Sequence, residues 1–159
     1  SPNGCGCGTR DAMHVAICCI TLRRPEGLGR LLDGLSRLTF RKNPLPEITV
    51  IVVDNDGAAP MRARIEAVRP EFRWHLRYGC EPVRGVSSAR NRALDLVPPD
   101  ADYVAFIDDD EVPAPAWLDE LLHVSRTYDA PIVQGPVRPV FLSPPPGWLI
   151  QGWPSSAMR

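Results

Sequence analysis

Several features that identify common protein classes are missing from this 159-residue sequence. Lysine occurs once, at Lys42, and the formal net charge is −1, so no basic field exists for nucleic acid. No apolar run reaches the roughly 20 residues that a membrane-spanning helix needs. The N-terminus also lacks the apolar core of a signal peptide. We therefore expect a cytoplasmic domain without a nucleic-acid partner.

The cysteine pattern does not suggest a metal site. There are five cysteines, and none forms a C-x-x-C pair. Cys18 and Cys19 are adjacent in an apolar run, and in a strand they would point to opposite faces. The odd number and the missing secretion signal favour reduced thiols.

Two common phosphate-binding motifs are also absent. The turn after the first apolar run reads ITLRRPEGLG, without the G-x-G-x-x-G spacing of a dinucleotide site. A P-loop needs a Gly-Lys pair, which the only lysine, at position 42, does not form. If a phosphorylated ligand binds, its charge must be neutralised in another way, and a divalent cation held by carboxylates is one route.

What the sequence contains is an alternation of short apolar runs and amphipathic segments. This pattern predicts an α/β fold with a mostly parallel sheet and helices on both faces. A small, Gly-rich leader (1–13) precedes the predicted domain (14–142), and a Pro/Trp/Gly-rich tail (143–159) follows it. The predicted strands are 14–20, 47–54, 74–82, 102–110 and 131–141, and the predicted helices are 25–38, 61–70, 88–97 and 115–124.

Some side chains have expected places in these elements. Ser87 or Ser88 can cap the third helix, and Leu94 is expected on its inner side together with two alanines. Trp74 and Trp117 are expected to pack in the core rather than against a ligand.

Polar residues follow three of the predicted strands. Ligands of such sheets bind beyond the carboxyl ends of the strands, so we expect the three groups to share one rim. The groups are Thr21 with Arg23, Asp54 with Asp56, and Asp108 with Asp109 and Asp110.

The run Asp108–Glu111 places four acidic side chains in a row at the end of an apolar strand. In an extended segment, Asp108 and Asp110 project to the same side and Asp109 to the other. Carboxylate oxygens select hard cations, so this pair is a candidate Mg²⁺ or Mn²⁺ site. The alternative is an acidic loop exposed to solvent.

Four stretches, in order, resemble the family-2 glycosyltransferases, which have the GT-A nucleotide-sugar-binding fold. They are VAICCITLRRPEGLGRLLDGL, ITVIVVDNDG, EPVRGVSSARNRAL and YVAFIDDDEVPAPAWL. The third matches the family's Gly-x-x-x-Ala-Arg-Asn segment at Gly85, Ala89, Arg90 and Asn91, and the fourth carries the D-x-D motif. The resemblance runs from about His14 to Trp148.

The resemblance implies roles for the rim residues in binding a nucleotide sugar, most readily a UDP-sugar. Asp54 would read the base, Asp108 would contact the ribose region, and Asp110 would bind the metal. Arg90 would face the base or phosphates, and Thr21 would touch the nucleotide. Ile20-Thr21-Leu22-Arg23 stands where the family often has Pro-Thr-Tyr-Asn, so a tyrosine stacked on the base is not expected.

The implied reaction transfers the sugar to a hydroxyl of a saccharide or lipid-linked acceptor, with inversion. It needs a carboxylate base, yet no Asp or Glu follows Asp129. We therefore expect either a donor-binding part of a longer enzyme or a non-catalytic nucleotide-sugar-binding module. A sugar-1-phosphate nucleotidyltransferase is disfavoured, because TLRRPEGLG lacks that class's Gly-x-Gly-Thr-Arg start. A pure interaction domain leaves the acidic strand ends unexplained, and the tail could dock another part, a partner or a membrane surface.

Overall fold

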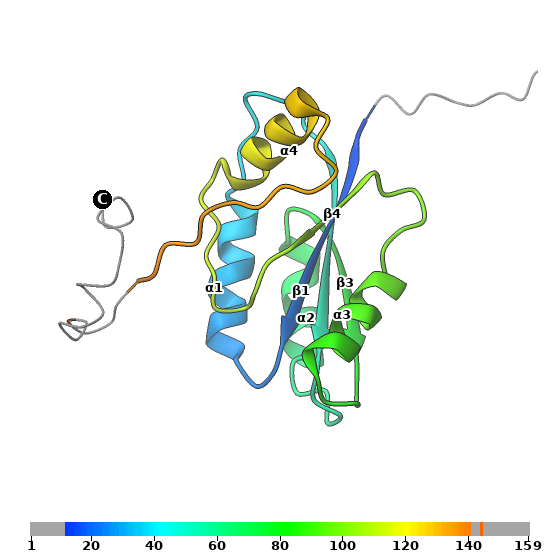
Figure 1. Ribbon diagram of the computed structural model, residues 1–159. Helices are drawn as coiled ribbons and strands as arrows, with labels where there is room; N and C mark the ends of the chain where they lie inside the picture. Colours follow the sequence, from blue (N-terminus) through cyan, green and yellow to red (C-terminus); the bar gives the residue numbers. More distant parts are fainter. Residues whose placement is uncertain (1–11, 141–143, 145–159) are drawn as a thin grey trace, which may run out of the picture.

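The computed structural model describes residues 12–140 and residue 144. Its centre is a four-stranded sheet in the order β3-β2-β1-β4, with every neighbouring pair parallel (Figure 1). The strands are β1 (His14–Thr21), β2 (Glu47–Asp54), β3 (His75–Cys80) and β4 (Tyr103–Phe106). The predicted parallel α/β fold is confirmed.

The two central strands are apolar on both faces because helices cover both sides. Alternate residues of β1 enter different cores: Val15, Ile17 and Cys19 join one, and Ala16 and Cys18 the other. Among the described residues, Cys18, Cys19 and Cys80 are free thiols. Burial raises the pKa of Cys18 to about 12, so this thiol stays protonated and unreactive.

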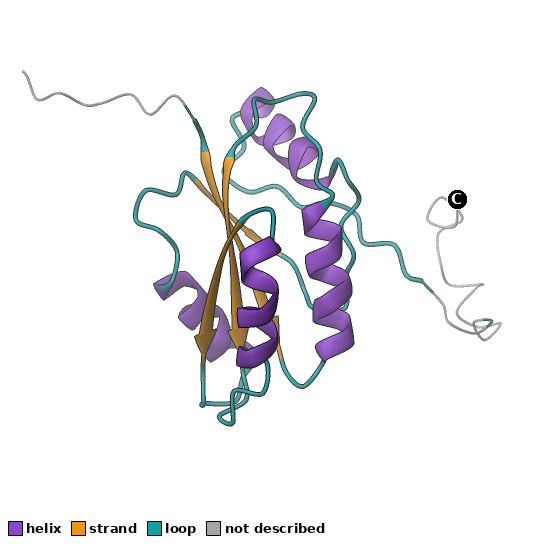
Figure 2. Ribbon diagram, turned by 180° about the vertical axis from the view of Figure 1, so that it is seen from behind, coloured by secondary structure: helices purple, strands orange, loops and turns teal. Residues whose placement is uncertain are grey.

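The helices divide between the two faces of the sheet (Figure 2). Leucines of α1 (Pro25–Ser36), Ile65 of α2 (Arg62–Val68) and two leucines of α4 (Trp117–Tyr128) share the larger core. A short 3-10 turn (Arg69–Glu71) extends α2. Two alanines of α3 (Val86–Asp95) pack on the other face. Trp74 and Trp117 pack against the larger core, as expected.

The edge strand β4 is less covered than its neighbours. Val104 and Phe106 are each 42% exposed, while Tyr103 and Ala105 pack against the larger core. The small helix α3 therefore protects β1 and β2 but leaves one side of β4 open.

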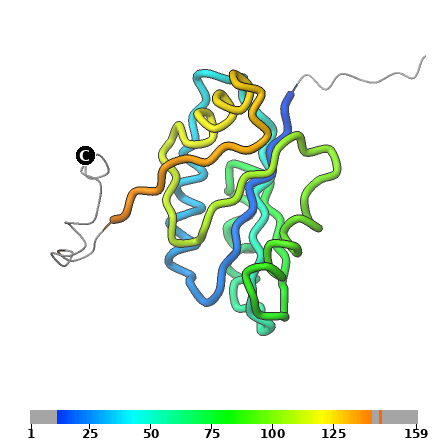
Figure 3. The backbone as a smooth tube through the Cα atoms, in the orientation of Figure 1, coloured from blue at the N-terminus to red at the C-terminus, as the bar shows by residue number. Residues whose placement is uncertain are grey.

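Three local predictions are wrong. Gly85 occupies the N-cap of α3, so Ser87 and Ser88 lie inside the helix and make no capping bond. Leu94 is 47% exposed, because the alanine stripe turns it away from the sheet. The strand expected at 131–141 does not form within 131–140, where the chain continues irregularly from α4 (Figure 3).

The predicted leader and tail lie almost wholly outside the described residues, as does Phe141 of the predicted last strand. Within the described part of the chain, no helix is long and apolar enough to cross a membrane.

Candidate functional site

The strand register brings the polar strand ends to one edge of the sheet. Thr21 pairs with Asp54, and Asp54 pairs with Cys80, so β1, β2 and β3 end level. Phe106, the last residue of β4, pairs with Cys18. The three residues after Phe106 therefore carry the chain to the level of Thr21, which places Asp109 beside it.

Asp109 is the buried member of the acidic run. It is 5% exposed, and the hydroxyl of Thr21 donates a 2.8 Å hydrogen bond to its Oδ2. Its Oδ1 lies 3.2 Å from Nη1 of Arg24, and the same nitrogen lies 2.9 Å from Oδ2 of Asp110. The charge of Asp109, followed by the hydrogen bonds that Arg24 donates to both carboxylates, raises the pKa of Arg24. The β1–α1 connection thus supplies a positive group for the acidic run.

Asp108 faces a different cation. Its Oδ1 lies 3.9 Å from Nη2 of Arg90 on α3, and the Arg90 guanidinium also lies 5.8 Å from the centre of the Phe106 ring. Both Asp108 and Asp110 are largely exposed, in contrast to Asp109. The acidic side chains therefore contact two different arginines. Asp109 and Asp110 pair with Arg24, and Asp108 lies near Arg90.

The extended conformation expected for the acidic run is wrong. The strand ends at Phe106, and the amide of Glu111 donates 3.1 Å to the carbonyl of Asp108, which closes a turn. The amide of Asp108 in turn donates a hydrogen bond to Oε2 of the Glu111 side chain. In this turn Asp110 is paired with Arg24 and Asp108 lies near Arg90, so both exposed carboxylates have a positive neighbour.

The end of β2 forms the second part of the site. Asp56 is buried and paired with Arg23, whose hydrogen bond is the main cause of the lowered pKa of Asp56. Arg23 has a positive φ of 55°. Consecutive arginines therefore hold two different acidic groups, and they join the β1–α1 loop to the loops after β2 and β4.

Asp54, expected to read a base, has no exposed surface. Its carboxylate accepts hydrogen bonds from the amides of Asp56 and Met61 and from the hydroxyl of Tyr78. Burial, followed by the neighbouring Asp54, raises the pKa of Tyr78, so the phenol remains a donor. In this arrangement Asp54 shapes the loop after β2, and it offers no free edge to a ligand.

Asn55 was missed by the sequence analysis, yet it connects β2 to the start of α3. Its Nδ2 donates to the carbonyls of Glu81 and Val83, and its Oδ1 accepts from the amide of Gly85. Gly85 has a φ of 147°, a conformation that favours glycine. Asn55 therefore fixes the loop that leads into α3 and to Arg90.

Arg24 was also missed. The available signal was its position directly before Pro25, at the start of the first predicted helix and on the expected rim. The sequence analysis selected the adjacent Arg23 instead. The sequence does not indicate which of two consecutive arginines faces the acidic run.

The rim carboxylates are candidate ligands of a divalent ion. No group of three or more His, Cys, Asp or Glu residues in 12–140 is arranged to hold a metal by itself. Mg²⁺, however, is usually bound by one or two carboxylates together with substrate phosphates. Asp110 and Asp108 are exposed oxygen donors on the acidic turn. They suit an ion whose other ligands come from a bound diphosphate and water.

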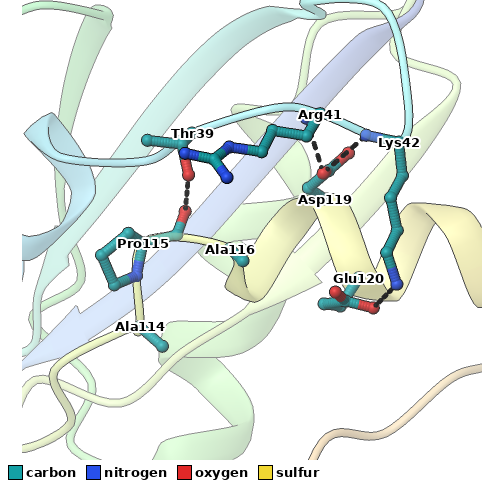
Figure 4. Close-up of a pocket in the computed structure, with 8 residues that line it drawn as sticks. All are labelled: Thr39, Arg41, Lys42, Ala114, Pro115, Ala116, Asp119 and Glu120. Atoms are coloured by element: carbon teal, nitrogen blue, oxygen red, sulfur yellow. Dashed lines mark hydrogen bonds and ion pairs between the residues drawn. The ribbon is translucent and has the colours of Figure 1, made fainter.

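A pocket lies away from this rim, between the loop after α1 and the start of α4 (Figure 4). Asp119 shapes it: its carboxylate accepts hydrogen bonds from the amides of Arg41, Lys42 and Asn43. None of the predicted site residues lines it. We interpret this pocket as structural, formed where Asp119 holds the loop after α1 against α4. We call these three hydrogen bonds the Asp119 clamp.

Comparisons with known proteins show which family and fold this chain resembles. The chain is 37% identical over 142 residues to the succinoglycan biosynthesis protein ExoM of Rhizobium meliloti, covering 89% of this chain and 44% of ExoM. It is 33% identical over 86 residues to ExoW of the same organism, covering 54% of this chain and 27% of ExoW. The chain thus spans less than half the length of these relatives.

The fold is similar to solved structures of TarS from S. aureus. For TarS 1-349, the TM-score is 0.60 at 21% identity, covering 74% of this chain and 33% of TarS 1-349. Structures of TarS 1-349 with UDP and with UDP-GlcNAc match with TM-scores of 0.59 and 0.57. The sequence model of glycosyl transferase family 2 matches residues 16–158. The chain therefore belongs to glycosyl transferase family 2.

Proposed function

We propose that this chain forms the donor-binding part of an inverting glycosyltransferase. It binds a nucleoside-diphosphate sugar, most readily a UDP-sugar, at the carboxyl edge of the sheet. The acceptor is a hydroxyl of a saccharide or a lipid-linked saccharide. The observation that carries the proposal is the convergence of Thr21, Arg24 and Arg90 from separate elements onto the acidic turn, where they contact Asp109 and Asp108. Family membership and the UDP complexes of TarS support it.

The exposed groups of the rim would contact the donor. Asp108 is assigned to the ribose region, while Arg90 and Arg23 provide positive charge for the nucleotide. Thr21 and Asp109 support the turn through their buried hydrogen bond. Gly85 provides the start of α3, and Asp54 and Asp56 hold the neighbouring loop.

A divalent ion, Mg²⁺ or Mn²⁺, would be held by Asp110, with Asp108 as a second carboxylate. When bound with the donor, such an ion supplies Lewis-acid stabilisation of the departing nucleoside diphosphate. The contribution of the chain is to orient these carboxylates, and the arginines balance their charge before the donor arrives.

Transfer also requires that a carboxylate remove the proton of the acceptor hydroxyl. No Asp or Glu follows Asp129 in this sequence, so no residue of the chain is assigned this role. A second candidate function, which needs no such base, is a nucleotide-sugar-binding module without turnover. Transfer or hydrolysis of UDP-GlcNAc by the chain, lost in Asp110→Ala, would refute the second candidate.

The first test is calorimetric titration with UDP, with and without Mn²⁺. Binding that depends on Mn²⁺ is the expected result, and Asp110→Asn should abolish it while the far-UV circular dichroism stays unchanged. Asp33→Asn is a matched control, because Asp33 is an exposed aspartate of α1 paired with Arg37. Absence of UDP binding by the folded wild-type chain would refute the proposed function.

A further inference from the structure

One nitrogen of Arg24 lies between two carboxylates of the acidic turn. Nη1 is 3.2 Å from Asp109 Oδ1 and 2.9 Å from Asp110 Oδ2. We propose that Arg24 is the internal counter-ion of the site, which holds Asp110 until a divalent ion replaces it and then binds the diphosphate of the donor. This inference rests on the proposed function and names a residue that family membership alone does not assign.

The backbone of Arg24 is held in place, so only its side chain needs to move. Arg24 is the N-cap of α1, and its carbonyl accepts a 3.0 Å hydrogen bond from the amide of Leu28. Pro25 follows at the first helical position, where its restricted φ suits the start of a helix. The first turn of α1 also packs against the backbone of Asp109 at Gly27. The guanidinium is thus delivered to the acidic turn from a rigid base.

The two partners of Arg24 respond differently to its departure. Asp109 keeps the hydroxyl of Thr21 as a 2.8 Å donor, so its buried carboxylate is not left without a hydrogen bond. Asp110 has an exposed side chain and Arg24 as its hydrogen-bond partner. An incoming cation can therefore bind Asp110 while Asp109 stays anchored to β1.

The ion pair is also weak enough to be exchanged. The Arg24 side chain is 58% exposed, and ion pairs in such solvated positions contribute little to stability. A divalent ion carries twice the charge of a guanidinium and is coordinated directly by carboxylate oxygens. A free guanidinium next to a diphosphate would form charge-assisted hydrogen bonds with its oxygens.

The neighbouring arginines do not share this position. Arg23 pairs with Asp56, and Arg90 approaches Asp108 at 3.9 Å. Among the ion pairs of the described residues, those of Asp109 and Asp110 are made by Arg24. The exchange is therefore specific to one side chain, which makes it testable with one substitution.

The test measures two affinities of Arg24→Gln that should change in opposite directions. Mn²⁺ binding without nucleotide is followed by the electron paramagnetic resonance signal of free Mn²⁺. It should become tighter by about threefold to tenfold, since a competing positive charge is gone. UDP binding at saturating Mn²⁺, measured by calorimetry, should become weaker by about tenfold, since a charged donor to phosphate is lost.

Two further variants separate this role from a structural one. Arg37→Gln removes an arginine of similar exposure that pairs with Asp33 on α1, and it should leave both affinities unchanged. Arg24→Lys keeps the charge and should restore Mn²⁺ affinity toward the wild-type value. Loss of structure would weaken the binding of both Mn²⁺ and UDP. Tighter Mn²⁺ binding together with weaker UDP binding therefore cannot come from partial unfolding.

The outcomes also separate this inference from the proposed function. If wild type binds UDP with Mn²⁺ but Arg24→Gln binds Mn²⁺ no more tightly, the counter-ion role is refuted and the donor site stands. If wild type and Arg24→Gln bind neither ligand, both proposals fail. Mn²⁺ binding detectable in Arg24→Gln and absent in wild type would support the exchange.

Discussion

Gly27 lies so close to Asp109 that a Cβ atom on Gly27 would stand 2.6 Å from the carbonyl oxygen of Asp109. The first turn of α1 and the acidic turn therefore touch backbone to backbone, and no side chain fits between them. The same stretch of backbone brings Thr21 and Arg24 into contact with the Asp109 side chain.

Gly27→Ala should disturb this contact. Because the methyl group meets a backbone atom, α1 or the acidic turn must shift, at a cost of about 1–3 kcal/mol in the free energy of unfolding. Urea unfolding measures this loss, and Mn²⁺-dependent UDP binding should weaken as well. Gly29→Ala is the control: its methyl would meet only the flexible end of Arg64, and alanine favours the helix. If Gly27→Ala and Gly29→Ala changed the free energy of unfolding equally, the close contact of Gly27 with Asp109 would be refuted.

Asn55→Asp should loosen the loop before α3. The new carboxylate cannot donate to the carbonyls of Glu81 and Val83 and would repel them, at a cost of about 2–4 kcal/mol. Hydrogen exchange should become faster at Gly85, whose amide is bound to the Asn55 side chain. Asn91→Asp, at an exposed position of α3, should have little effect. Unchanged exchange at Gly85 would show that Asn55 does not hold this loop.

Asp54→Asn tests whether this residue contacts the base or supports the loop. We expect a loss of about 1–3 kcal/mol in stability, because the amide group cannot accept all three hydrogen bonds that Asp54 receives. Tyr78→Phe removes one of them and should cost about 1 kcal/mol. Calorimetry with UDP, CDP and GDP provides the second readout. If Asp54→Asn changed the order of affinities for UDP, CDP and GDP while the free energy of unfolding stayed the same, Asp54 would be assigned to base recognition.

Asp119→Ala should destabilise the loop after α1. The carboxylate is 2% exposed and accepts three backbone amides, which would lose their partner at a cost of about 2–4 kcal/mol. Glu120→Gln is the control, because its exposed pair with Lys42 should contribute less than about 1 kcal/mol. Thermal or urea unfolding compares the two variants. A smaller effect of Asp119→Ala than of Glu120→Gln would contradict the clamp.

The Asp119 clamp should also depend on pH. Burial acts to raise the pKa of Asp119, but the hydrogen bonds from Arg41, Asn43 and Lys42 outweigh it and hold the pKa below that of an ordinary aspartate. A carboxylate with a lowered folded-state pKa stabilises the protein above its unfolded pKa and loses this contribution as the pH falls. The stability difference between wild type and Asp119→Asn should therefore shrink below about pH 4. A difference that is constant from pH 7 to pH 3 would refute the assignment.

The sequence determined the fold class and the rim. Continuous apolar runs such as VIVV, at 50–53, are typical of strands buried between two layers of helices, and parallel strands place all their carboxyl ends at one edge. Thr21, Asp56 and Asp109 could thus be assigned to one edge from spacing alone. The family could be inferred as well, because four motifs occur in order.

Tertiary structure decided the pairing of charges within the rim. Arg24 meets Asp109 while Arg23 meets Asp56, and this choice, like the positive φ at Arg23 and the close approach of α1 at Gly27, cannot be read from local pattern. The same holds for Asn55, whose partners lie 26 to 30 residues away in the chain. Apolar periodicity reports burial, which is an average over many contacts. The choice of one hydrogen-bond partner over another depends on distances of a few ångströms, which only the packed backbone sets.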